Sequence, residues 1–219
     1  MDDLLDSTDP FTVEGQVAIV TGASSGLGER FCQVLADRGA IVIGAARRVD
    51  RLEALADRVG GLLPVQCDIT DDAQRDKLVS VAVEHGGPDI VVNNAGVSDA
   101  VTLAHEETPD QFRRVLEVNL IAAFLLSGAV AREMIDHGRG GSIVNVASIL
   151  GLVSSGGNHQ AGYVVSKTGL LGMTRELAKQ WADHNIRVNA ICPGYFESEL
   201  TAEMFVSEDT PGLRYIRRN

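Results

Sequence analysis

The sequence predicts an α/β fold, a doubly wound parallel sheet with helices on both faces. Short runs of apolar, often β-branched residues alternate with stretches in which apolar residues recur at helical three- and four-residue spacing. Continuously apolar runs are typical of strands buried on both faces, and strands that alternate with helices form parallel sheets. We expect the strand order 3-2-1-4-5-6, in which ligands bind at the carboxyl ends of the strands.

The first half of the chain supplies three strands and three helices. The strands are the apolar runs at residues 17–21, 41–45 and 62–67. The helices show apolar side chains on one face: Leu27, Phe31 and Val34 in the first, Leu52, Leu55 and Val59 in the second, and a third helix over residues 72–85.

The second half supplies three more strands, at residues 90–93, 142–146 and 186–191. Between them we expect a long helix over residues 109–137, with Thr108 as its cap, and a last helix over residues 162–183. The apolar face of the long helix serves either the core or an oligomer contact. No repeat or linker divides the chain, which predicts an acidic, flexible N-terminus at residues 1–12 and a single domain over residues 13–219.

Composition excludes several classes of protein. The chain has 219 residues, 45% of them apolar, and a net charge of −11, as in one ordinary globular domain. Because an acidic protein is repelled by phosphate backbones and anionic lipids, we expect neither nucleic acid nor a membrane as partner. The longest nearly apolar stretch, residues 120–131, is 12 residues long, too short to span a bilayer.

Targeting and cysteine usage predict a cytoplasmic protein. The first 29 residues contain six acids and no Lys or Arg, whereas a secretory signal begins with basic residues. The three cysteines, Cys32, Cys67 and Cys192, lie far apart. They indicate neither a disulfide framework nor a zinc site, and we expect no bound metal.

A glycine-rich loop lies between the first strand and the first helix. Gly22, Gly26 and Gly28 leave the backbone free to approach a pyrophosphate at the positive end of that helix. Ser24 and Ser25 add hydroxyl donors, and Leu27 lies in the same loop. The alternative is that the glycines serve only the geometry of a strand-to-helix turn.

The turn after the second strand favours NADP(H) over NAD(H), although NAD(H) stays possible. NAD-binding folds place an acid there to bind the ribose 2′-hydroxyl, but this chain has Ala45 and Ala46, followed by Arg47 and Arg48. Guanidinium groups bind a 2′-phosphate through charge-assisted hydrogen bonds. In the alternative interpretation these arginines, with Arg51, form a solvated surface.

Tyr163 and Lys167 form the predicted catalytic pair. They lie four residues apart on one predicted helix and so share a face. With three Tyr and three Lys in the chain, this spacing is expected by chance about 0.04 times. A nearby ammonium favours the phenolate, so we expect a lowered pKa for Tyr163 and a role as general acid/base. Ser148 is placed to hold the same substrate oxygen, and Asn119 to complete a polar relay.

In combination, these motifs resemble the short-chain dehydrogenase/reductase family, in its single-domain Tyr-x-x-x-Lys branch. The resemblance covers residues 17 to about 200. The matching residues occur in the family's order: Thr21, Gly22, Gly26, Gly28, Asp68, Asn93, Asn94, Ala95, Gly96, Asn119, Ser148, Tyr163, Lys167, Pro193 and Gly194.

The resemblance implies an NAD(P)-binding Rossmann-like domain and a role for each matching residue. Asp68 and Ile69 would lie beside the adenine. Asn94, Ala95 and Gly96 would lie behind the cofactor. Lys167 would hold the nicotinamide ribose. Tyr163 would be the acid/base, Ser148 would orient the substrate and Asn119 would support a proton relay. Ser198 stands where the family usually has a Thr near the carboxamide, beside Pro193 and Gly194.

The chain departs from the family pattern at two places. A longer loop, residues 154–160, separates Ser148 from Tyr163, and we interpret His159 as a loop or specificity residue. The family also usually continues beyond the position of Asn219 through another helix and a seventh strand, so we expect that strand to be missing and the domain to be short at its C-terminus.

The leading hypothesis is an NADP(H)-dependent oxidoreductase that interconverts a ketone or aldehyde with a secondary or primary alcohol. The chain resembles sugar-acid dehydrogenases and 3-oxoacyl-carrier-protein reductases alike. We expect a small-molecule carbonyl or alcohol substrate and a homodimer or homotetramer. A dinucleotide-binding sensor or scaffold without turnover is the alternative from another class.

Overall fold

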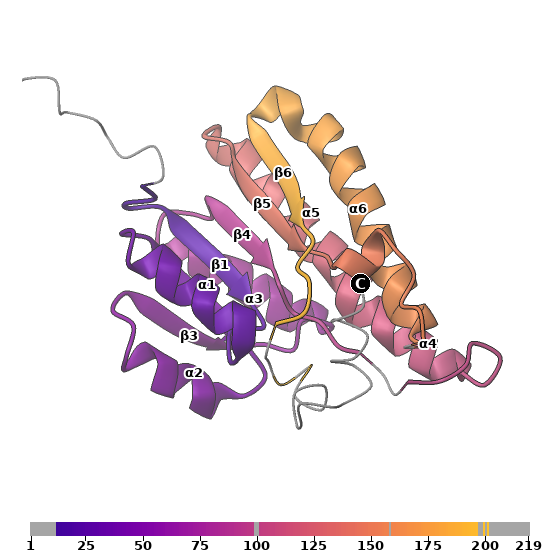
Figure 1. Ribbon diagram of the computed structural model, residues 1–219. Coiled ribbons are helices and arrows are strands. Elements are labelled where there is room, and N and C mark those ends of the chain that lie inside the picture. The colour runs from indigo at the N-terminus through magenta and orange to yellow at the C-terminus, as the bar shows by residue number, and fades with distance from the viewer. Residues whose placement is uncertain (1–11, 99–100, 158, 197–198, 200, 202–219) are drawn as a thin grey trace, which may run out of the picture.

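A parallel six-stranded sheet forms the centre of the protein (Figure 1). The computed structural model describes residues 12–98, 101–157, 159–196, 199 and 201. The strand order is β3-β2-β1-β4-β5-β6, with parallel neighbours throughout. The predicted fold class and strand order are confirmed, and no seventh strand joins the sheet within these residues.

The helices and strands alternate along the chain as expected. The strands are β1 (Val17–Thr21), β2 (Ile41–Ala46), β3 (Leu62–Gln66), β4 (Ile90–Asn93), β5 (Gly141–Val146) and β6 (Ile186–Ile191). The α-helices are α1 (Gly26–Ala36), α2 (Val49–Ala56), α3 (Asp72–Glu84), α4 (Pro109–Leu116), α5 (Ala122–His137) and α6 (Ala161–Trp181). The short helices are η1 (Glu117–Ile121), η2 (Ile149–Gly151) and η3 (Ala182–His184).

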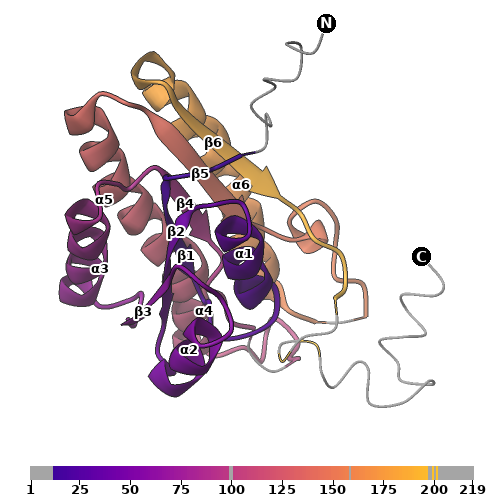
Figure 2. The ribbon, with the colours of Figure 1, turned by 90° about the vertical axis from the view of Figure 1, so that its left-hand side faces the viewer.

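Both faces of the sheet are covered. Figure 2 shows α3 and α5 on one side of the sheet and α1 and α2 on the other. Successive side chains of a strand point to opposite faces. Ile19 therefore joins the core under α3, α5 and α6, whereas Val20 joins the core under α1 and α2. This two-sided burial explains why the strands are continuously apolar.

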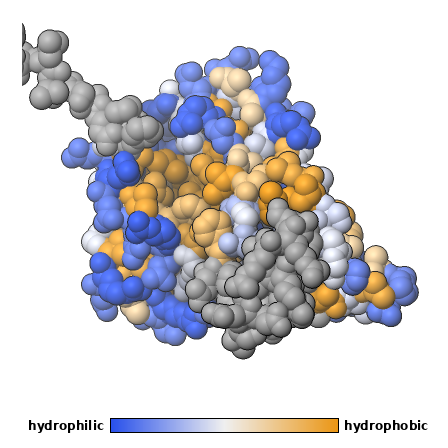
Figure 3. Space-filling model, viewed as in Figure 1, coloured by the Kyte–Doolittle hydropathy of each residue, from blue (hydrophilic) through white to orange (hydrophobic). Residues whose placement is uncertain are grey.

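The surface is polar over two helices and apolar beside them. On the face seen in Figure 3, hydrophilic residues cover α1 and α2, and apolar residues gather over the strands beside α1.

The long helix predicted over residues 109–137 is interrupted. A π-helical segment, η1, separates α4 from α5 and contains Asn119. The side chain of Asn119 bonds both backbone groups of Val97: Oδ1 accepts from Val97 N at 2.8 Å, and Nδ2 donates to Val97 O at 2.9 Å. π-helical turns often occur at functional sites, and this one directs Asn119 toward the carboxyl end of β4.

By length and composition, the helical segment from Pro109 to His137 could cross a membrane. It has 29 residues and contains an apolar window of 18 residues with a mean hydropathy of 1.6, which the count of 12 nearly apolar residues did not indicate. In the fold, 44% of that apolar window is buried, and Ala122, Leu126 and Val130 belong to the main core. The apolar character of the segment therefore matches its place in the core.

We predict that Gly28→Ala destabilises the protein by about 1–3 kcal/mol. A Cβ at residue 28 would collide with the carbonyl oxygen of Gly22 and lie 2.6 Å from Nδ2 of Asn94. Chemical unfolding followed by circular dichroism measures the change.

Gly128→Ala in α5 is the matched control, because a Cβ there would meet nothing within 4 Å. We expect this control to gain about 0.5–1 kcal/mol from helix propensity. An equal loss in both variants would contradict the steric argument.

Candidate active site

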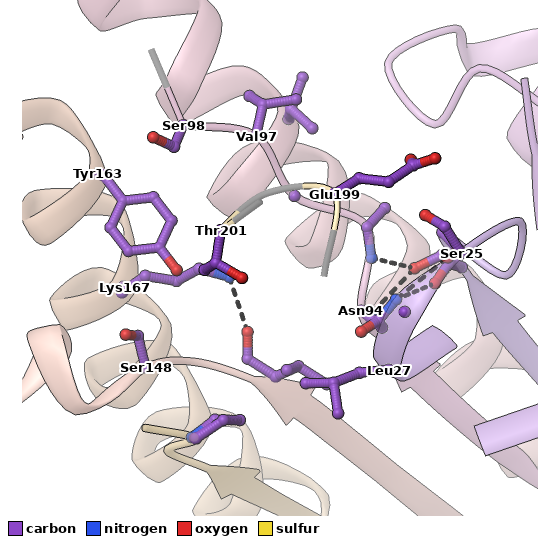
Figure 4. A pocket seen from close by; sticks show the side chains of 18 of the residues that line it. Ser25, Leu27, Asn94, Val97, Ser98, Ser148, Tyr163, Lys167, Glu199 and Thr201 are labelled. Atoms are coloured by element: carbon purple, nitrogen blue, oxygen red, sulfur yellow. Dashed lines mark hydrogen bonds between the residues drawn. The ribbon is translucent and has the colours of Figure 1, made fainter. Parts of the chain in front are cut away.

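A cleft of about 610 Å³ opens at the carboxyl ends of the strands. Most of the residues singled out in the sequence line it: Gly22, Ser24, Ser25, Gly26, Leu27, Arg47, Arg48, Asp68, Ile69, Asn94, Ala95, Gly96, Ser148, Tyr163, Lys167, Pro193 and Gly194. Figure 4 shows Tyr163, Lys167 and Ser148 on one side of the pocket and Ser25 and Asn94 on the other. Ser198 lies outside the described residues.

The glycine loop brings the start of α1 to the floor of the cleft. Gly22 and Gly26 have φ angles of 66° and 57°, in the left-handed region that glycine adopts most readily. Ser25, the N-cap residue, does not bond the first turn of α1 with its side chain. Because the first N–H groups of a helix need partners, this turn fits a pyrophosphate.

Hydrogen bonds join the end of β1 to the end of β4. Thr21 Oγ1 accepts from the backbone N of Asn94 and of Ala95, each at 3.0 Å. The side chain of Asn94 donates in return to the carbonyl oxygen of Thr21 at 2.9 Å. These bonds hold Asn94, Ala95 and Gly96 along the wall of the cleft.

Asp68 follows β3 at the end of the cleft assigned to the adenine. Its Oδ1 accepts from the backbone N of Thr70 at 3.0 Å and from Thr70 Oγ1 at 2.8 Å. These bonds hold the pKa of Asp68 below its usual value.

Arg48 and Arg51 converge on one carboxylate. Arg48 Nη2 donates to Ser24 Oγ and Ser25 Oγ, each at 3.1 Å, and to Glu199 Oε2 at 2.8 Å. Arg51 Nη1 donates to the other oxygen of Glu199. The two guanidinium groups lower the pKa of Glu199 to about 2.

Sequence reasoning did not connect Glu199 with the arginines, and it placed Arg51 only in a charged cluster. No local pattern could have found the contact, because Arg48 and Glu199 are 151 residues apart in the chain.

Lys167 is buried beside Tyr163. Its Nζ donates to the carbonyl oxygen of Val146 at 2.8 Å and lies 5.6 Å from the centre of the Tyr163 ring. Burial lowers the pKa of Lys167 to about 8.

The pKa of Tyr163 is raised, contrary to the expectation from the sequence. Burial is the main cause, and a hydrogen bond with Ser148 only partly opposes it. The spacing of Tyr163 and Lys167 indicated a nearby ammonium, but it did not reveal how deeply the phenol is buried. At neutral pH this phenol carries its proton.

Asn119 lies behind the cleft and does not line it. Its Nδ2 donates to Ser166 Oγ at 3.0 Å, and Ser166 Oγ donates to the carbonyl oxygen of Tyr163 at 2.7 Å. Together with the bonds to Val97, this arrangement connects η1 with the first turn of α6. Asn119 thus fixes where the backbone of Tyr163 lies.

His159 borders a different cavity. A second hollow of about 490 Å³ is lined by Thr102, Leu152 and Val164 together with these residues of the loop: Ser154, Ser155, Gly156, His159 and Gln160. His159 lines this second hollow and does not line the main cleft.

Cys32 and Cys67 are buried and do not supply an ionised thiol. Burial raises the pKa of Cys32 to about 12 and the pKa of Cys67 to about 11. In the part of the chain that the structure describes, no three or more His, Cys, Asp or Glu side chains are grouped as metal ligands would be.

Comparisons with known proteins agree with this geometry. Residues 16–209 match the family model of the short chain dehydrogenases. The chain is 36% identical over 208 residues to a 2-dehydro-3-deoxy-D-gluconate 5-dehydrogenase of Dickeya dadantii, with 91% of this chain and 79% of the relative covered. It is 37% identical over 193 residues to the 3-oxoacyl-[acyl-carrier-protein] reductase of Escherichia coli, with 86% and 76% covered.

Solved structures give the same result. A short-chain type dehydrogenase/reductase from Mycobacterium marinum superposes with a TM-score of 0.86 at 36% identity, covering 89% of this chain and 78% of the other. A 3-ketoacyl-(acyl-carrier-protein) reductase from Brucella melitensis, complexed with NADH, superposes with a TM-score of 0.82 at 31% identity, covering 87% and 80%. The chain belongs to the short-chain dehydrogenase family, whose members are oxidoreductases that act on CH–OH groups.

Proposed function

We propose that this protein is an NADP(H)-dependent oxidoreductase that interconverts a ketone or aldehyde with the corresponding alcohol, with Tyr163 as general acid/base. The observation that carries the proposal is the shared cleft, in which Tyr163, Ser148 and Lys167 face the glycine loop. When bound, the nicotinamide cofactor supplies or accepts the hydride.

The cleft offers a binding group for each part of the dinucleotide. The first turn of α1 would hold the pyrophosphate, and Asp68 with Ile69 would border the adenine. Arg47, Arg48 and the two serines of the glycine loop would bind the 2′-phosphate. Asn94, Ala95 and Gly96 would back the cofactor, with Pro193 and Gly194 toward the carboxamide.

Tyr163 acts as the proton donor in carbonyl reduction. Because burial raises its pKa, the phenol holds a proton at neutral pH and can give it to the substrate oxygen. The hydroxyl of Ser148 orients that oxygen. The ammonium of Lys167, beside the ring, stabilises the phenolate that remains. In alcohol oxidation Tyr163 must first release its proton.

The names of the relatives suggest two classes of substrate, sugar acids and 3-oxoacyl thioesters. A 3-oxoacyl group carries a ketone, and dehydrogenation of a sugar-acid hydroxyl produces one, so in both reactions a carbonyl oxygen would bond with the phenol of Tyr163. The proposal covers either class.

We also propose that the protein forms a homodimer or homotetramer. Ile121, Phe124 and Leu125, on η1 and α5, are 41%, 50% and 40% exposed, and an apolar patch on a helix favours self-association. The cytoplasmic location expected from the sequence stays a prediction.

We predict that Tyr163→Phe lowers kcat for carbonyl reduction about 100- to 10,000-fold, because it removes the proton donor. Binding of NADPH, measured by fluorescence titration, should change little. Tyr195→Phe, which removes the phenol hydroxyl of a second tyrosine that lines the cleft, is the matched comparison and should cost less than about tenfold. A kcat of Tyr163→Phe within about tenfold of the wild-type value would refute the acid/base role.

Arg48→Ala should weaken binding of NADPH about 10- to 100-fold through loss of a charge-assisted hydrogen bond. Binding of NADH should change much less, because NADH lacks the 2′-phosphate. Arg58→Ala is the control, since Arg58 pairs with Glu29 at 2.9 Å and does not line the cleft. Equal losses for the two cofactors in Arg48→Ala would show that Arg48 does not bind the 2′-phosphate.

The pH profile of kcat/KM for carbonyl reduction should bend downward above about pH 8, where Lys167 loses its proton. This parameter reports groups of the free enzyme. Tyr163, with its raised pKa, stays protonated across the bend. A profile that stays flat to about pH 10, the usual range of a tyrosine, would contradict the role given to Lys167.

A further inference from the structure

The carboxylate of Glu199 lies where the 2′-phosphate of the cofactor is proposed to bind. One oxygen accepts from Arg48 at 2.8 Å, and the other accepts from Arg51. Arg48 also contacts both serines of the glycine loop. The Glu199 carboxylate has two oxygens, and each is bound by a different guanidinium. Arginines bind a phosphate group in the same way.

Glu199 is charged whenever a dinucleotide could bind. The two arginines lower its pKa to about 2, so it keeps its negative charge at neutral pH. A 2′-phosphate and this carboxylate cannot both occupy the arginine pair without strong repulsion. NADP(H) must therefore displace Glu199 from Arg48 and Arg51.

The contact is weak enough to be displaced. The side chains of Arg48, Arg51 and Glu199 are 43%, 45% and 49% exposed. Exposed ion pairs are screened by water and salt, and each pair contributes little free energy. Such a pair lowers the affinity of a competing anion by a modest factor without closing the site.

Glu199 also brings a carboxylate close to the end of β2, where NAD-binding folds have an acid and this chain has none. NAD-binding folds place a carboxylate at the end of the second strand, but β2 ends in Ala45 and Ala46. Glu199 follows β6 and brings a carboxylate to the turn after β2 from the other side of the cleft. NADH, which carries a hydroxyl in place of the 2′-phosphate, does not have to displace this charge.

We propose that Glu199 is a specificity-determining residue that competes with the 2′-phosphate for Arg48 and Arg51, and so lowers the preference for NADP(H) over NAD(H). The inference rests on the proposed function, in which Arg48 binds the 2′-phosphate. Arg51 would bind the 2′-phosphate together with Arg48.

The test compares Glu199→Gln with the wild-type protein in binding titrations. NADPH and NADH are titrated by fluorescence, and adenosine 2′,5′-bisphosphate and 5′-AMP by calorimetry, so that no step depends on turnover. Affinity for the two ligands with a 2′-phosphate should rise about three- to tenfold, the scale of two exposed ion pairs. Affinity for NADH and 5′-AMP should not rise.

Glu53→Gln is the matched control. Glu53 is an exposed acid of α2 outside the contacts between Arg48, Arg51 and Glu199, and its loss removes the same charge from the same region. If Glu53→Gln raises affinity for NADPH as much as Glu199→Gln does, the effect is only long-range charge and the inference is wrong. A rise in affinity for NADH equal to that for NADPH would also overturn it.

A double variant, Arg48→Ala with Arg51→Ala, separates this inference from the proposed function. If the double variant loses NADPH selectively while Glu199→Gln changes nothing, the inference about Glu199 fails and the proposed function stands. If the double variant weakens both cofactors equally, the proposed use of NADP(H) fails, and the inference fails with it.

Discussion

The close packing of the glycine loop against the end of β4 is the constraint on which the site depends. Thr21 Oγ1 accepts hydrogen bonds from the backbone N–H groups of Asn94 and Ala95. A Cβ on Gly28 would collide with the carbonyl oxygen of Gly22. Any larger side chain there would push α1 away from β4. Since the start of α1 and the end of β4 form two walls of one cleft, this contact sets the width of the groove that a dinucleotide enters.

Burial determines the chemistry at the other end of the cleft. Lys167 is 4% exposed and donates to a carbonyl oxygen at the end of β5. Tyr163 keeps its proton because burial outweighs the bond with Ser148. Charges in such a site are weakly screened, so the Lys167 ammonium stabilises a phenolate more strongly than it would in water. In the proposed mechanism, the burial that keeps Tyr163 protonated therefore also strengthens the effect of the Lys167 ammonium.

The positions of the strands and helices were predictable because apolar runs and helical spacing are local signals, and the strand order followed from the topology that alternating strands and helices adopt. The features that sequence reasoning missed depend on contacts between distant residues. The π-helical turn at Asn119 comes with bonds to Val97, 22 residues away, so the long helix was predicted as one unit. The pKa of Tyr163 depends on burial, which the spacing to Lys167 does not report. Glu199 and Arg48 are 151 residues apart in the chain and meet only in the folded structure.

The net negative charge of the chain makes a local pair of arginines important for binding an anion. With a net charge of −11, the protein repels a dinucleotide anion at long range, and a local site must overcome that repulsion. In the proposed function Arg48 and Arg51 do so, and in the structure they also bind Glu199. An exposed ion pair adds little to the stability of the fold. In the proposed cofactor binding the ion pair has a larger effect, because the 2′-phosphate competes directly with Glu199 for the arginines. A small free energy then becomes a several-fold factor in the ratio of the dissociation constants for NADPH and NADH. Choice of cofactor, rather than stability, is the property that this contact can control.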